Sequence, residues 1–72
     1  MNIKINTEYI KLDQLLKFSG VAFSGAEAKD MILAGCVSVN GELCQMRGKK
    51  MYPGSAAVID LGDGEIEEIK VE

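Results

Sequence analysis

Three cations lie within four residues near the middle of the chain, and their chemistry points to an anionic partner. Arg47, Lys49 and Lys50 surround a glycine in the run Arg47-Gly48-Lys49-Lys50. Clustered positive charges repel one another unless a negative group lies among them, and Gly48 lets the backbone come close to such a group. Phosphate oxygens suit this arrangement. A solvated loop that only keeps the protein soluble fits the same four residues.

Two further lysines and one aromatic residue bear on this cluster. Lys29 is expected on a helix at the border of its apolar stripe, and Lys11 comes just before another helix, so both can extend the cluster. Tyr52 adjoins it, and its ring either stacks on a nucleobase or packs over a sheet edge beside Pro53. Packing is favoured because aromatic side chains bury large areas in small cores. We therefore leave Tyr52 outside the candidate site.

The sequence contains no constellation typical of catalysis. There is no histidine, no nucleophile paired with a base, and no glycine-rich phosphate loop between a strand and a helix. Cys36 and Cys44 form no CxxC pair and no zinc-ligand set, so they are expected to be free, buried thiols. These absences predict a binding protein rather than an enzyme, with no cofactor, no metal and no small-molecule substrate.

The formal charge of −3 at first argues against a nucleic-acid partner, but the charge is unevenly divided. Up to Gly54 there are seven basic and five acidic side chains, a net charge of +2. Beyond Gly54 one lysine stands against six acidic side chains, a net charge of −5. A basic face can therefore exist on this acidic chain.

The length and composition predict one small globular domain over residues 1–72. An apolar fraction of 47% and a charged fraction of 26% are ordinary for such a domain. No apolar run approaches the roughly 20 residues of a membrane helix, and the N-terminus lacks the apolar core of a signal peptide. We therefore expect no membrane association and a cytoplasmic location.

Two short helices are expected in the first half of the chain. Leu12 and Leu16 mark a buried face at helical spacing, and Ser24 with Glu27 has the spacing of a capping box. In that motif the serine hydroxyl accepts from a first-turn amide while the glutamate accepts from the serine amide. The short connection between the helices predicts a helical hairpin with Phe23 near the crossing.

The second half of the chain has the period of two that is typical of strands. Asn40-Gly41 is the strongest short-range signal for a tight hairpin, and turns are also expected at 52–54 and 62–64. The expected elements are an extended arm or edge strand over 3–10, helices over 12–19 and 24–34, and strands over 36–39, 42–46, 56–59 and 66–71. The predicted class is α+β, a two-helix hairpin packed on a small, mainly antiparallel β-sheet.

Residues 8–61 resemble a known RNA-binding family. The similar positions are Lys11-Leu12-Asp13-Gln14-Leu15-Leu16, Ser24, Glu27-Ala28-Lys29, Ile32, Gly35, Val37, Val39-Asn40-Gly41 and Pro53-Gly54. Their order and spacing resemble the RNA-binding domain of ribosomal small-subunit protein four. The chain is most similar to the short stand-alone bacterial branch called YaaA or YbcJ, in which a basic segment follows the second strand.

The resemblance implies the αL RNA-binding fold, with RNA lying along the helix pair and the adjoining loop. It implies that the RNA contacts are Lys11, Lys29, Arg47, Gly48, Lys49 and Lys50. The expected partner is structured RNA, ribosomal RNA foremost, in ribosome assembly or translation. Gly25 stands where many members have arginine, and Ser55 stands where aspartate is common. One RNA contact of the family is therefore absent from this chain.

Two alternatives remain beside RNA binding. A protein-protein adaptor can use the same fold without any RNA. A β-grasp sulfur carrier of the ThiS or MoaD kind has a hairpin similar to Val39-Asn40-Gly41-Glu42. Such carriers need a C-terminal Gly-Gly, whereas this chain ends Lys70-Val71-Glu72. RNA binding is the favoured hypothesis and the carrier the least favoured.

Overall fold

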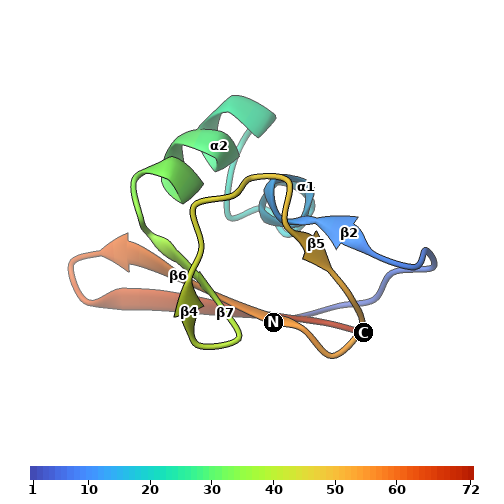
Figure 1. The fold of residues 1–72 in the computed structure, drawn as a ribbon. Coiled ribbons are helices and arrows are strands. Elements are labelled where there is room, and N and C mark those ends of the chain that lie inside the picture. The colour runs from blue at the N-terminus through green and yellow to red at the C-terminus, as the bar shows by residue number, and fades with distance from the viewer.

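The computed structural model describes all of residues 1–72 and contains two helices and seven strands (Figure 1). In chain order the elements are β1 (Asn2–Ile3), β2 (Ile10–Lys11), α1 (Leu12–Phe18), α2 (Gly25–Leu33), β3 (Val37–Val39), β4 (Glu42–Leu43), β5 (Lys50–Met51), β6 (Ala56–Gly62) and β7 (Glu65–Val71). Figure 1 shows both helices on one face of the larger sheet.

The larger sheet is mixed and has the strand order β1-β7-β6-β3-β4. Only β1 and β7 pair in parallel, while the β7-β6, β6-β3 and β3-β4 pairs are antiparallel. β2 and β5 form a separate antiparallel pair. The predicted α+β class is confirmed, and the sheet is antiparallel apart from the β1-β7 pair.

The hairpin between β3 and β4 turns at Asn40-Gly41, as predicted. Both residues have positive φ, 50° at Asn40 and 87° at Gly41, as a type I′ turn requires. The Asn40 side-chain Oδ1 also accepts a hydrogen bond from the amide of Ala56 at 2.9 Å. The turn is therefore tied to the start of β6 as well as to its own two strands.

The two helices lie where the sequence places them, within a residue or two at each end. On α1, Leu12, Leu15 and Leu16 are fully buried. At the start of α2, Ser24 Oγ accepts from the Glu27 amide at 3.1 Å. Neither helix combines the length and the apolar composition that a membrane crossing requires.

Two details of the connection between α1 and α2 differ from the prediction. The carboxylate of Glu27 accepts from the amide of Phe23 at 3.3 Å, one residue before the expected Ser24. The Phe23 side chain is 93% exposed instead of packed at the crossing. Ala22 takes the buried position, and its amide donates to the Leu16 carbonyl at 3.0 Å, so the next side chain turns outward.

Two expected strands are shorter than predicted. The arm over 3–10 is split into β1 and β2, because its first residues pair with β7 and its last with β5. The strand over 42–46 ends at Leu43. After it, the Cys44 amide still donates to Val37, but the Gln45 side chain donates to the Leu33 carbonyl at 3.0 Å, which draws the chain up to the helices.

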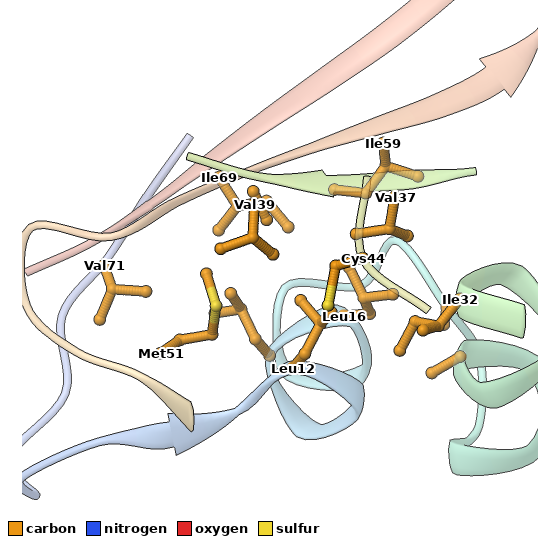
Figure 2. Packing of buried hydrophobic residues seen from close by; sticks show 14 residues of the cluster. Leu12, Leu16, Ile32, Val37, Val39, Cys44, Met51, Ile59, Ile69 and Val71 are labelled. Carbon is orange, nitrogen blue, oxygen red and sulfur yellow. The ribbon is translucent and has the colours of Figure 1, made fainter. Parts of the chain in front are cut away.

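One apolar cluster lies between the helices and the sheet (Figure 2). Its fourteen buried residues are Leu12, Leu15, Leu16, Ala22, Ala28, Ile32, Val37, Val39, Cys44, Met51, Ala57, Ile59, Ile69 and Val71. In Figure 2, Met51 points from β5 into the space between Val71 and Leu12. Both cysteines are free, with Cys44 buried and Cys36 only half-buried.

Candidate functional site

The β2-β5 pair brings two lysines from distant parts of the chain side by side. Ile10 pairs with Met51, and Lys11 pairs with Lys50. Met51 is fully buried, and its burial fixes which face of β5 turns inward. Because side chains alternate across a strand, Lys11 and Lys50 both point to solvent, where they are exposed.

Lys11 and Lys50 form a like-charge cross-strand pair, which costs stability. Directly opposed side chains have Cβ atoms about 4.5 to 5.5 Å apart, and like charges there are unfavourable by a few tenths of a kcal/mol up to about 1 kcal/mol. An anion bound between the two ammonium groups removes that repulsion. This geometry is therefore suited to a phosphate group.

The segment that leads to β5 is held against both helices by backbone and side-chain hydrogen bonds. At its start, the Gln45 side chain is bonded to the end of α2. At its end, the carbonyls of Arg47 and Lys49 accept from the first two amides of α1, those of Asp13 at 3.1 Å and Leu12 at 2.8 Å. The three cations of the run are thereby placed beside Lys11 at the start of α1.

Backbone amides of the same segment are available to a ligand. Arg47 and Gly48 are exposed, and their amides donate to no protein acceptor. A Cβ built on Gly48 would meet nothing within 4 Å, so the backbone here is open to close approach. Phosphate oxygens are ordinary acceptors for such amides. Asp13 offsets part of the local positive charge, although its carboxylate also accepts from the Gln14 amide at 2.8 Å.

The structure therefore brings five of the six predicted residues together, and Lys50 differs from expectation in lying on a strand rather than in a loop. The sixth, Lys29, is exposed on the middle of α2 and makes no hydrogen bond with the segment. Lys29 lies one turn before Leu33 on the same face of α2. It belongs to the surface of the helix pair, whereas the other five residues gather at the β2-β5 pair.

Tyr9 is part of this surface and was not among the residues expected from the sequence. The Lys50 Nζ atom lies 4.9 Å from the centre of the Tyr9 ring, within the range of a cation-π contact. The Tyr9 and Tyr52 rings are 5.8 Å apart between centroids and tilted by 53°. No local signal could have found Tyr9, because its neighbours come from a strand far along the chain.

Three acidic groups lie at the end of the molecule opposite the β2-β5 pair. The turn between β6 and β7 carries Asp63, with Asp60 and Glu65 beside it on the two strands. Figure 1 shows this turn at the opposite side of the view from β2 and β5. These three acidic groups therefore lie away from the cations of the β2-β5 pair, whereas Glu8 and Asp13 lie close to them in the sequence. A local basic surface on an acidic protein can still attract a polyanion.

Comparison with known families matches residues 3–70 to the family model of the S4 domain. The chain belongs to the S4 domain family. A similar protein is the probable ribosome maturation protein RlbA of Bacillus subtilis (strain 168), which is 41% identical over 58 residues. The aligned region covers 81% of this chain and 82% of that relative. The S4 match includes every residue of the candidate site, from Lys11 on β2 to Lys50 on β5.

Proposed function

We propose that this protein is an RNA-binding module that docks its basic edge onto structured RNA, with ribosomal RNA as the target, during ribosome assembly. The proposed contacts are Lys11, Lys29, Arg47, Gly48, Lys49 and Lys50. The 72 residues act in this proposal as one RNA-binding domain with no catalytic role.

The observation that carries the proposal is the gathering of Lys11 and Lys50 with the Arg47 to Lys49 segment at one end of an acidic protein. Such an arrangement costs stability in the free protein, and a polyanion offsets that cost. Membership of the S4 domain family supports RNA as the polyanion, and the name of the Bacillus relative supports a role in ribosome maturation. The family match gives no support to a sulfur carrier.

The proposed path of the RNA follows the αL arrangement, along the helix pair and across the Arg47 to Lys50 run. Lys29 on α2 then contacts one part of the RNA backbone, and the cations of the β2-β5 pair contact another. The two surfaces are joined by the segment that Gln45 and the Arg47 and Lys49 carbonyls hold against the helices. A rigid connection of this kind keeps both sets of cations in register with the phosphates of a folded RNA.

The test replaces the three cations of the run by alanine, in the variant Arg47→Ala/Lys49→Ala/Lys50→Ala. Binding to purified ribosomal RNA is titrated at several salt concentrations. Removal of one cation from a phosphate lowers the slope of log affinity against log salt by about 0.7 to 0.9, so the slope of the triple variant should fall by about 2 to 3. Exposed replacements of this kind usually change stability by less than about 0.5 kcal/mol each, so the protein should still fold.

The matched control is Lys4→Ala/Lys17→Ala/Lys70→Ala, which removes three exposed cations outside the site and changes the net charge equally. This control should keep most of the wild-type affinity and slope. Equal affinities and equal slopes for the site variant and the wild type would remove the run from the interface and favour the adaptor alternative. Crosslinking in cells followed by sequencing of the bound RNA identifies the target.

A further inference from the structure

The outward face of the β2-β5 pair carries two tyrosines next to its two lysines. Tyr9 comes just before β2 and Tyr52 just after β5, so they occupy the position beyond the Ile10-Met51 pair. Side chains alternate along a strand, and Tyr9 and Tyr52 therefore share a face with Lys11 and Lys50. The ring centroid distance of 5.8 Å agrees with this placement.

The two rings are not equivalent. Tyr9 is half-buried, and the Lys50 ammonium lies over its ring. Tyr52 is 43% exposed, and a tilt of 53° between the rings means that Tyr9 covers only part of it. Tyr9 thus packs between Lys50 and Tyr52, and the Tyr52 ring has the larger surface accessible to a ligand.

The backbone of Tyr52 is fixed by a tight turn. The Tyr52 carbonyl accepts from the Ser55 amide at 2.8 Å, and its amide donates to Ser55 Oγ at 3.2 Å. Gly54 has a φ of 98°, which the third position of a type II turn requires after Pro53. With the backbone fixed in this way, only the two side-chain torsions of Tyr52 have to be ordered when its ring binds a ligand.

We propose that Tyr52 is a stacking platform for an unpaired nucleobase whose neighbouring phosphates lie on Lys11 and Lys50. Single-stranded nucleotides bind proteins through basic groups that hold the backbone and aromatic rings that hold the bases. Residues two apart on a strand are separated by about 7 Å, so the lysines and the ring lie within reach of adjacent groups of one nucleotide chain. This inference rests on the proposed function and adds its ligand class, a loop or bulge within a structured RNA.

The experiment uses a fluorescently labelled RNA hairpin with an adenosine loop and the same hairpin with an abasic loop, which keeps the phosphates but lacks the bases. The wild-type protein should bind the adenosine hairpin more tightly. Tyr52→Leu, which keeps apolar volume beside Tyr9, should weaken that binding about tenfold, as expected for the removal of one base stack, and should leave the abasic hairpin unaffected. Tyr52→Phe keeps the ring and should bind as the wild type does.

Two further readouts separate stacking from a change of charge or fold. Tyr52→Leu removes no cation, so its salt dependence should equal that of the wild type. The chain has two tyrosines and no tryptophan, so Tyr9→Phe leaves Tyr52 as the source of tyrosine emission, which a stacked base should quench. Thermal melting of each variant shows whether the protein remains folded.

The outcomes distinguish this inference from the function on which it rests. If the wild type binds both hairpins equally, or if Tyr52→Leu binds the adenosine hairpin as well as Tyr52→Phe does, the stacking site is wrong while RNA binding stands. The stacking site is also wrong if the tyrosine emission of Tyr9→Phe is not quenched when this variant binds the adenosine hairpin. If the wild type binds neither hairpin nor ribosomal RNA, the proposed function fails and the stacking site fails with it.

Discussion

Replacing Lys11 by glutamate should stabilise the free protein and weaken RNA binding at the same time. Lys11→Glu removes the repulsion with Lys50 and puts an attractive pair in its place, while Lys50 keeps its contact with Tyr9. Lys11 is also the N-cap residue of α1, where a negative group is favourable. If Lys11→Glu is more stable than the natural protein, the positions of Lys11 and Lys50 serve the binding of a partner and not the stability of the fold.

The expected size of the gain follows from these contacts. Cross-strand charge pairs contribute about 0.2 to 1 kcal/mol each, and an acidic group at a helix N-terminus about 0.3 to 1 kcal/mol. Together they amount to about 1 kcal/mol, because all the groups are exposed and partly screened. For a domain of this size that raises the Tm by about 4 to 8 °C. The gain should be largest at low salt and nearly vanish at about 1 M salt, where the Debye length is about 3 Å.

The assay compares thermal melts and ribosomal RNA affinities of Lys11→Glu with those of Lys17→Glu. Both variants change the net charge by the same amount, but Lys17 lies in the last turn of α1, where a cation is favourable. Lys17→Glu should therefore lower the Tm slightly and affect RNA binding less. An unchanged or lower Tm for Lys11→Glu at low salt, or an RNA affinity equal to that of Lys17→Glu, would refute the reasoning.

Two further predictions concern the fold. Met51→Ala, at a fully buried position, should lower the free energy of unfolding in urea by about 2 to 5 kcal/mol. Phe23→Ser, at a side chain that is 93% exposed, should change it by less than about 0.5 kcal/mol, and equal effects of the two variants would contradict their difference in burial. Asn40→Ala removes the hydrogen bond from the Ala56 amide and places alanine, which lacks asparagine's tolerance of positive φ, at φ 50°, so it should cost about 1 to 2 kcal/mol of stability. Asn40→Asp keeps an acceptor oxygen and should cost less. The reverse order would show that the turn does not need this hydrogen bond.

Much of the local structure could be predicted from the sequence, because it depends on neighbours within four residues. The buried face of α1 follows from the spacing of its leucines, and the start of α2 follows from Ser24 and its contact with Glu27. The Asn40-Gly41 turn follows from the preference of those two residues for positive φ. The cluster of three cations in the Arg47 to Lys50 run could also be identified from the sequence, because these residues are neighbours along the chain.

The arrangement of the candidate site was decided by the tertiary structure. β2 and β5 are two residues long, too short to show a period, and they pair across most of the chain's length. Burial of Met51 between α1 and β7 sets which face of β5 turns inward, and so places Lys50 opposite Lys11 and Tyr52 beside Tyr9 (Figure 2). The sequence by itself determined which residues could bind an anion. Only the packing of the core decided which of these residues lie side by side, because β2 and β5 pair through the burial of distant residues and not through local conformational preference.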